Sequence, residues 1–208
     1  MFISFEGIDC CGKTTQVALL IERLQSLGHR VLLLREPGGT TISEKIREIL
    51  LDKRNLKMTQ ISELLLFSAS RSQLVNEVIK PALQQRSIVI CDRYVDSTTA
   101  YQGYGRGLPL GAVKTINRVA TMDVMPALTF FIDITVKEMH ERRRASRQEA
   151  DRMEMGTEEF FQRVREGYHA IAQEEPERFT VINGLQTVEA VQEEIWRRLE
   201  GRLPERND

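Results

Sequence analysis

Short apolar runs alternate along the chain with longer segments in which apolar residues recur every three or four positions. The runs lie at 2–5, 31–34, 88–91, 128–132 and 179–182. Most of them are continuously apolar, which is typical of strands that are buried on both faces of a sheet. We therefore predict five strands at these positions, with helices between them.

Three helices are marked most clearly. The apolar positions are 17, 20, 21, 24 and 27 in the first helix and 188, 191, 195 and 199 in the last. Gly28 follows the first helix as a C-terminal stop. Thr41 and Glu44 have the Thr-x-x-Glu spacing of a capping box, which predicts that a second helix begins there and runs toward Leu50.

The alternation of buried strands and helices predicts the fold class. Such an order favours a mostly parallel sheet with helices on both faces. We expect a three-layer α/β/α fold with a five-stranded parallel sheet in a single domain over 1–208, because no repeat or Pro/Gly/Ser-rich linker marks a boundary. Ligands of such sheets bind beyond the carboxyl ends of the strands, so the residues after each strand are the candidates for function.

The charge balance excludes some functions. Among 208 residues, 29 Lys and Arg nearly balance 30 Asp and Glu, which argues against a surface that grips nucleic acid or an anionic membrane. No uncharged apolar run approaches the roughly 18 residues of a membrane span, and the first residues lack a signal-peptide pattern, so we expect a cytoplasmic protein. Cys10, Cys11 and Cys91 form neither a disulfide framework nor a metal-spaced pair.

A phosphate-binding loop follows the first predicted strand. Residues 7–14, GIDCCGKT, match GxxxxGK[ST] between a strand and a helix. Backbone N–H groups of such a loop surround a β-phosphate, Lys13 would reach the β- and γ-phosphates, and Thr14 would offer its hydroxyl to Mg²⁺. The third strand ends in Asp92, a second candidate to hold Mg²⁺. The predicted triphosphate-binding residues are Gly7, Ile8, Asp9, Cys10, Cys11, Gly12, Lys13 and Thr14.

Three segments beyond strands two and three point to a second ligand. They are REPGGT at 35–40, DRY at 92–94 and STTAYQ at 97–102. Arg35 and Arg93 suit a monophosphate, because a guanidinium group binds phosphate with two parallel hydrogen bonds. Phe67 and Arg71 are four positions apart and share a helix face, which would suit a nucleobase. From its spacing alone, Phe67 is better explained as a core residue.

With these motifs the chain resembles the bacterial thymidylate kinases. The resemblance rests on FEGID with its phosphate-binding loop, REPGGT, LLFSASR at 65–71, DRY, STTAYQG at 97–103 and DR-x-E at 151–154, which together span nearly the whole chain. It implies the P-loop fold of the nucleoside monophosphate kinase type. It also implies an enzyme that phosphorylates dTMP to dTDP with ATP and Mg²⁺, and that forms a homodimer.

The resemblance also implies roles for residues on the phosphate and sugar side. Asp9 would contact the sugar 3′-hydroxyl and help to place Arg93. Arg93 would bridge the acceptor phosphate and the γ-phosphate of ATP, and Glu36 would line the deoxyribose and magnesium side of the pocket. The predicted acceptor-binding residues are Asp9, Arg35, Glu36, Phe67, Arg71, Arg93, Thr98, Tyr101 and Gln102.

On the base side, the resemblance implies that Phe67 stacks on thymine and that Arg71 donates to the base carbonyl O4. Thr98 and Gln102 would touch the base edge around N3. Tyr101 would crowd a ribose 2′-hydroxyl and so favour deoxyribose.

An arginine cluster at 142–147 predicts a lid. This stretch holds four arginines and no acid, and a solvated helix end is the ordinary explanation for such a charge run. We favour a lid over 142–156 that closes over ATP. Some members of the resembled family carry a basic residue inside the phosphate-binding loop and others carry it in the lid. Positions 8–11 hold no basic residue here, so we expect the catalytic arginine to come from the lid. The predicted catalytic residues are Lys13, Arg93, Asp9, Arg143 and Arg147.

Alternatives remain at this stage. Another nucleoside monophosphate, or a deoxynucleoside, is an alternative acceptor. A GTPase-like switch is disfavoured because no NKxD motif occurs. Redox sensitivity of Cys10 is conceivable because loop N–H groups and Lys13 favour a thiolate, but inert thiols are the better interpretation. The reaction requires none of the three histidines.

Overall fold

A five-stranded parallel sheet forms the middle layer of the computed structural model, which describes residues 1–146 and 151–204. The strands are β1 (Phe2–Glu6), β2 (Val31–Arg35), β3 (Ile88–Asp92), β4 (Leu128–Asp133) and β5 (Phe179–Asn183). They pair in the order β2-β3-β1-β4-β5, all in parallel. The predicted fold class is confirmed, and each strand runs one polar residue further than its apolar run. These polar residues stand at the carboxyl edge.

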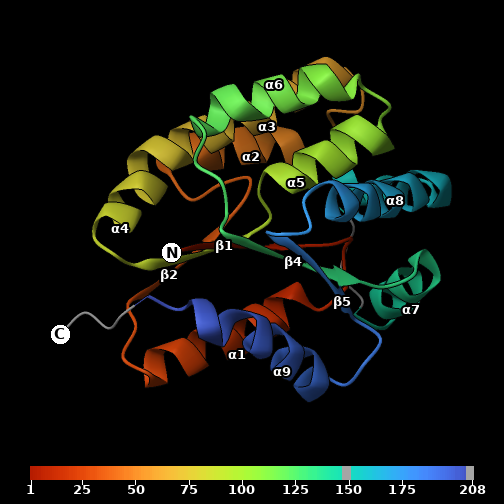
Figure 1. Ribbon diagram of the computed structural model, residues 1–208. Coiled ribbons are helices and arrows are strands. Elements are labelled where there is room, and N and C mark those ends of the chain that lie inside the picture. Colours follow the sequence, from red (N-terminus) through yellow and green to blue (C-terminus); the bar gives the residue numbers. More distant parts are fainter. Residues whose placement is uncertain (147–150, 205–208) are drawn as a thin grey trace.

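Helices cover both faces of the sheet (Figure 1). On one face lie α1 (Lys13–Ser26) and α9 (Val188–Leu199). On the other lie α2 (Thr41–Leu51), α3 (Gln60–Leu74), α4 (Lys80–Gln84), α5 (Val95–Thr98), α6 (Leu110–Thr121) and α8 (Glu158–Glu174). Helix α7 (Val136–Ser146) follows β4 at the carboxyl end of the sheet. The described residues also form four short segments: the π-helical η1 (Val75–Ile79) and η2 (Thr99–Gly105), and the 3₁₀ turns η3 (Met153–Met155) and η4 (Glu200–Arg202).

The predicted capping box of α2 is wrong by one residue. Thr40, not Thr41, is the N-cap, and its Oγ1 accepts a hydrogen bond from the Ser43 N–H at 3.1 Å. Glu44 instead accepts from the N–H of Gly39 at 2.7 Å, one residue before the cap. Two threonines in sequence each satisfy the capping preference, and the extended backbone of Thr40 decides between them.

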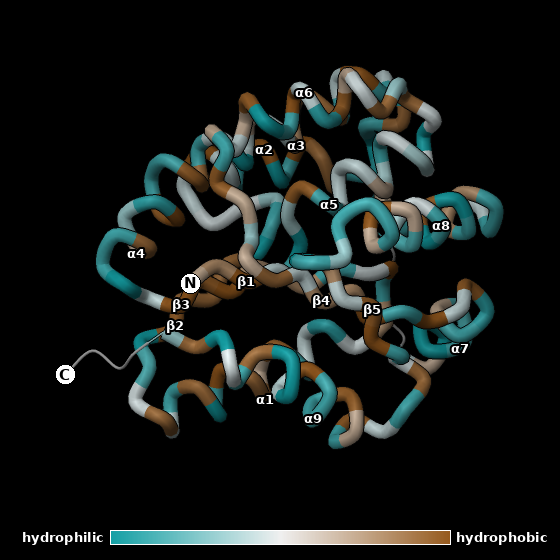
Figure 2. The backbone as a smooth tube through the Cα atoms, viewed as in Figure 1, coloured by the Kyte–Doolittle hydropathy of each residue, from teal (hydrophilic) through white to brown (hydrophobic). Residues whose placement is uncertain are grey.

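The hydrophobic core lies on both sides of the central strands. Figure 2 shows the most hydrophobic residues gathered in the sheet. Ile3, Phe5 and Phe130 in β1 and β4 are completely buried. The two edge strands are not buried on both faces: Leu33 of β2 is 50% exposed and Val181 of β5 is 38% exposed. An edge strand has a neighbouring strand on one side only, so its side chains are less well covered. Among the described residues, no helix combines the length and the apolar character needed to cross a membrane.

Candidate active site

The phosphate-binding loop connects β1 to α1, and two of its glycines are required by its backbone. Gly7 has φ 140°, and a Cβ there would lie 2.6 Å from the backbone oxygen of Ile132. Gly12 has φ 97° and is the N-cap of α1. Both conformations favour glycine. The loop thus brings the N-terminus of a long helix to the carboxyl edge of the sheet, which is a site for anionic phosphate.

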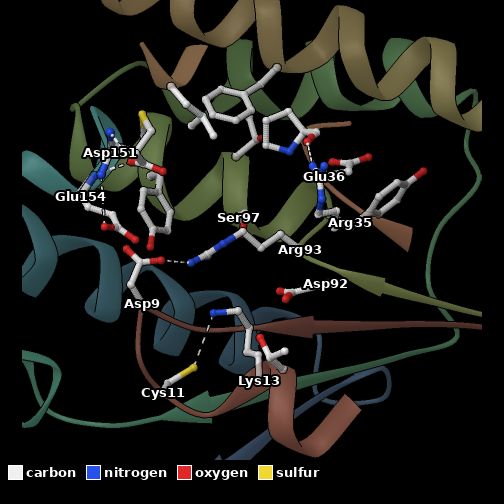
Figure 3. Close-up of a pocket in the computed structure, with 18 of the residues that line it drawn as sticks. Asp9, Cys11, Lys13, Arg35, Glu36, Asp92, Arg93, Ser97, Asp151 and Glu154 are labelled. Atoms are coloured by element: carbon white, nitrogen blue, oxygen red, sulfur yellow. Dashed lines mark hydrogen bonds and ion pairs between the residues drawn. The ribbon is translucent and has the colours of Figure 1, made fainter. Parts of the chain in front are cut away.

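Lys13 is the first residue of α1, and its ammonium group turns back over the loop. Nζ donates to the backbone oxygens of Gly7 at 3.1 Å and of Ile8 at 3.2 Å, and it lies 3.6 Å from Sγ of Cys11 (Figure 3). These acceptors are uncharged. A phosphate oxygen is a stronger acceptor for an ammonium group and would compete for it.

The thiols near the loop have the properties of ordinary reduced cysteines. All three cysteines are free. Burial raises the pKa of Cys10, and the neighbouring charge of Arg143 only partly opposes this effect. Burial likewise raises the pKa of Cys91 well above its usual value. A thiol with a raised pKa is less often a thiolate, so the structure favours the inert interpretation.

Asp9 of the loop and Arg93, which directly follows β3, point toward one another (Figure 3). Arg93 Nη2 lies 2.6 Å from Asp9 Oδ1, and Arg93 Nη1 donates to the Gly7 backbone oxygen at 2.8 Å. Burial acts to raise the pKa of Asp9, but the charges of Arg93, Lys13 and Arg143 outweigh it, and the pKa is lowered. Asp9 is therefore an ionised carboxylate between cationic groups.

The end of α7 brings two of the cluster arginines to this loop. Arg143 Nη2 lies 3.6 Å from Asp9 Oδ2, and Nη1 donates to the backbone oxygen of Glu154 at 2.8 Å. Its Nε and Nη2 are buried without a hydrogen-bond partner among the described residues. Arg142 donates to the backbone oxygen of Cys10 at 3.4 Å, whereas Arg144 stays at the surface. Arg147 lies outside the described residues.

The two residues predicted to hold Mg²⁺ both line the pocket beside the loop. Thr14 is exposed in the first turn of α1. Asp92 ends β3, and its Oδ1 is buried with no hydrogen-bond partner among the described residues. Among the residues that the structure describes, no group of three His, Cys, Asp or Glu side chains could hold a metal ion by itself. The donors fit Mg²⁺, which takes one or two protein oxygens and completes its shell with phosphate and water.

Across the pocket, Arg71 and Glu36 form a buried ion pair. Arg71 Nε and Nη2 lie 2.8 and 2.6 Å from Glu36 Oε2. The remaining N–H groups of Arg71 donate to Thr98, Asn117 and the backbone oxygen of Tyr94, so all five are engaged. Glu36 Oε1 has no such partner in the described chain, and burial raises the pKa of Glu36 more than Arg71 lowers it. Glu36 lines the pocket, and one of its two carboxyl oxygens thus has no hydrogen-bond donor among the described residues.

Phe67, Tyr101 and Gln102 line the same half of the pocket. Phe67 is half-buried and also packs against the core, so both interpretations of its spacing apply. The hydroxyl of Tyr101 is buried without a partner among the described residues, and burial raises its pKa. Gln102 donates through Nε2 to Glu63 at 2.9 Å.

Most of the sequence-predicted residues thus line one cavity of about 570 Å³, a volume that accommodates a nucleotide-sized ligand. Gly7, Ile8 and Arg143 are not among its lining residues. Sequence reasoning missed Arg47, which lies on α2 in this cavity and donates to the Pro37 backbone oxygen at 2.9 Å. Arg35 donates to the same oxygen at 2.9 Å. No motif marks Arg47. It lies on α2, the helix that follows the loop after β2, and its position beyond the carboxyl end of a strand is the one sequence feature that could have indicated it.

These observations define the class of protein. One pocket at the carboxyl edge of a parallel sheet has a phosphate-binding loop on one side. Its other side carries arginines, an aromatic ring and polar side chains that could contact a nucleobase. This is the arrangement of a P-loop kinase for a nucleoside monophosphate. The family model for thymidylate kinase matches residues 5–195. The chain belongs to the thymidylate kinase family.

Individual relatives agree over nearly the whole chain. The thymidylate kinase of Thermoanaerobacter sp. strain X514 is 50% identical over 194 residues, which cover 93% of this chain and 94% of that protein. That of Caldanaerobacter subterraneus subsp. tengcongensis is 51% identical over 199 residues, with 96% and 94% covered. The crystal structure of thymidylate kinase from Ehrlichia chaffeensis aligns with a TM-score of 0.78 at 39% identity, covering 96% of this chain and 98% of that one.

Proposed function

We propose that this chain transfers the γ-phosphoryl group of ATP to dTMP and so produces dTDP, with Mg²⁺ as cofactor. One observation carries the assignment of roles. Arg93 stands between the phosphate-binding loop and the acceptor half of a single pocket, paired with Asp9 of the loop. A guanidinium group at that position can contact both phosphates at once.

The proposed mechanism is positioning and charge neutralisation. Phosphoryl transfer needs little covalent chemistry from the protein, and an oxygen of a phosphate monoester is already a nucleophile, so no general base is required. Lys13 would leave the backbone oxygens of Gly7 and Ile8 for the phosphates of ATP. Arg93 would hold the acceptor phosphate in line with the γ-phosphate.

Mg²⁺ would neutralise charge on the β- and γ-phosphates when bound. We assign Thr14 and Asp92 as the residues that hold it. The proposal for Asp92 is supported by its buried Oδ1, which has no hydrogen-bond partner among the described residues. That for Thr14 is supported by its position in the first turn of α1.

On the sugar and phosphate side of the acceptor, we assign Asp9 to the 3′-hydroxyl, Arg35 to the phosphate and Glu36 to the deoxyribose region. Oε1 of Glu36 has no hydrogen-bond partner within the described part of the chain, which supports its role as an acceptor of hydrogen bonds from the ligand. Tyr101 would exclude a ribose 2′-hydroxyl, which is consistent with a rigid, buried ring at the pocket wall.

On the base side, we assign Phe67 to stacking and Thr98 and Gln102 to the edge around N3. Arg71 would donate to thymine O4. Because its five N–H groups are already engaged, the base carbonyl would share the Nη1 donors with Thr98 and Asn117. Arg71 is thus held in a fixed orientation before the base arrives.

The lid over 142–156 would supply the arginine that the phosphate-binding loop lacks. Arg143 is the better supported of the two candidates, because its guanidinium group lies beside Asp9 and its Nε and Nη2 have no hydrogen-bond partner among the described residues. Arg147 remains a second candidate.

We also propose a homodimer. Ile61 and Leu65, one turn apart on α3, are 52% and 51% exposed, which supports a contact through this helix. Light scattering after gel filtration measures the assembly directly, and the mass of a single chain at micromolar concentration would contradict the proposal.

The experiment that tests the function is release of ADP from ATP with dTMP, dUMP, UMP or AMP as acceptor. We expect rapid turnover of dTMP, slower turnover of dUMP and very little with UMP or AMP. Preference for AMP or UMP, or for an unphosphorylated deoxynucleoside, would instead identify a kinase with another acceptor.

A further inference from the structure

Glu63 is a buried carboxylate behind the base side of the pocket. It lies in the first turn of α3 and is 2% exposed. Its Oε1 accepts from Gln102 Nε2 at 2.9 Å and from Arg106 Nε at 3.1 Å, and its Oε2 accepts from Arg152 Nη1 at 2.6 Å. Glu63 does not line the pocket, whereas Gln102 does.

The partners of Glu63 keep it ionised. Burial acts to raise the pKa of Glu63, but hydrogen bonds and charge from Arg106, Gln102 and Arg152 outweigh it, and the pKa is lowered. An ionised carboxylate accepts hydrogen bonds and has no proton to donate. Only the nitrogen end of the Gln102 carboxamide can therefore face it, because the opposite orientation would place two acceptors in contact and leave both unpaired inside the protein.

This orientation determines what Gln102 presents to a ligand. With Nε2 committed to Glu63, the oxygen Oε1 is on the other side of the planar group and is left as an acceptor. Thymine and uracil carry a donor at N3, which is an N–H. Cytosine carries an unprotonated N3, which is an acceptor and would repel another acceptor.

We propose that Glu63 is a positioning residue for specificity: it fixes the carboxamide of Gln102 with its oxygen toward the base, and so selects a pyrimidine that has an N–H at N3 over cytosine. The inference rests on the proposed function, since it requires that dTMP binds in this pocket with its N3 edge near Gln102. It assigns a role to a residue that does not touch the substrate.

Glu63 also has a structural role, which the test must separate from the proposed one. Through Arg152, which belongs to the proposed lid, it ties that segment to the end of α2, because Arg152 Nε also donates to the Leu50 backbone oxygen at 2.6 Å. Loss of that anchor would lower activity with every acceptor alike. Only a change in the relative activity with two bases reports on the orientation of Gln102.

The test compares kcat/KM for dTMP and dCMP in the full-length enzyme with ATP and Mg²⁺. In Glu63→Gln the new side-chain amide can either donate or accept a hydrogen bond. The Gln102 carboxamide can then rotate by 180° and exchange the positions of its oxygen and nitrogen. We expect the ratio of kcat/KM for dTMP over dCMP to fall about tenfold, which corresponds to about 1.4 kcal/mol, the scale of one hydrogen bond. A parallel fall with both acceptors and an unchanged ratio would overturn the inference.

Two control variants keep a pure acceptor in front of Gln102. Glu63→Asp retains the carboxylate, and Arg106→Gln removes a different partner of the same carboxylate. Both are expected to keep the ratio within about twofold of the wild-type value even where both rates fall. A tenfold fall in the ratio with Arg106→Gln would show that general loosening of the pocket explains the effect, and would contradict the inference.

An exchange variant covers the case in which Glu63→Gln does not fold. In the double variant E63Q/Q102E the amide and the carboxylate change places, so the group that faces the base again presents an acceptor. We expect a ratio within about threefold of wild type, and a ratio tenfold lower would overturn the inference. Absence of dTMP turnover by the wild-type enzyme would instead refute the proposed function, so the two failures are distinguishable.

Discussion

The guanidinium group of Arg143 at the end of α7 lies 3.6 Å from the carboxylate of Asp9 in the phosphate-binding loop. The other oxygen of Asp9 pairs with Arg93 at 2.6 Å. One carboxylate of the loop therefore holds an arginine from the last turn of α7 and the arginine that directly follows β3. Nε and Nη2 of Arg143 have no hydrogen-bond partner in the described chain, so two donors beside this carboxylate are unsatisfied.

The first prediction concerns this lid arginine. Arg143→Ala should lower kcat about 100-fold or more with little change in the KM for ATP or dTMP, because a donor that acts mainly on the transferring group stabilises the transition state more than the ground state. Steady-state kinetics of ADP release measures both constants.

Arg144→Ala is the matched control, since Arg144 lies next in sequence but is exposed and donates to the backbone oxygen of His140. We expect kcat within about twofold of wild type. Arg147→Ala and the double variant with Arg143→Ala complete the set. Wild-type kcat in both single variants and in the double would contradict a catalytic arginine in the lid.

The second prediction concerns Mg²⁺. Chelation should abolish ADP release and added Mg²⁺ should restore it. In Asp92→Asn the Mg²⁺ concentration for half-maximal activity should rise about tenfold or more, because a neutral amide oxygen is a weaker ligand for this cation than a carboxylate. Titration of activity with Mg²⁺ measures the shift.

Asp123→Asn is the control for the loss of one negative charge. Asp123 is exposed with φ 58°, a conformation that Asn tolerates well. Its Mg²⁺ dependence should equal that of the wild type. An unchanged Mg²⁺ requirement in Asp92→Asn would remove this residue from the metal site.

The third prediction concerns stability as a function of pH. Burial, followed by the charge of Asp96, raises the pKa of Glu6 from 4.5 to about 7. Between these values the folded chain binds more protons at this site than the unfolded chain, so the free energy of unfolding falls as pH rises through this window. The loss amounts to about 3 kcal/mol at most, and it is complete above the folded pKa.

Urea unfolding of wild type and Glu6→Gln at pH 5 and pH 8 tests this prediction. The amide does not titrate, so the stability of wild type relative to the variant should decrease by this amount between the two pH values. Titrating groups that do not interact with Glu6 cancel in the comparison. An equal difference at both pH values would mean that Glu6 has an ordinary pKa in the folded chain.

The sequence predicts the sheet well because the signal is local. Each apolar run becomes a strand, and a polar residue such as Glu6, Asp92 or Asp133 ends it at the carboxyl edge. The π-helical turns are not predicted, because the spacing of apolar residues over five to seven positions does not distinguish them from an α-helical turn. In η1 and α4 the sequence does offer one cue: Pro81 has no N–H, which interrupts the regular hydrogen-bond ladder.

The candidate site is predictable where a motif carries it and not where distant side chains complete it. The loop, Arg93 and Arg71 lie in recognisable motifs. Tyr168, whose hydroxyl donates to Glu6 at 3.0 Å, and Asn117, which accepts from Arg71 at 3.1 Å, lie in helices without a motif. Such contacts depend on the packing of α6 and α8 against the sheet, and no local pattern encodes that packing.

The fourth prediction concerns a buried ion pair that holds α5 against the start of β5. Arg178 donates to both oxygens of Asp96 at 2.8 Å, and the Asp96 side chain is almost completely buried. Arg178→Ala should lower the free energy of unfolding by about 3–5 kcal/mol, because it leaves a buried carboxylate without its countercharge.

Lys114→Ala is the control, since it removes a half-exposed ion pair with Glu174. It should lower the free energy of unfolding by less than about 1 kcal/mol. Urea denaturation at neutral pH measures both. Equal losses in the two variants would mean that water reaches Asp96 and replaces its partner.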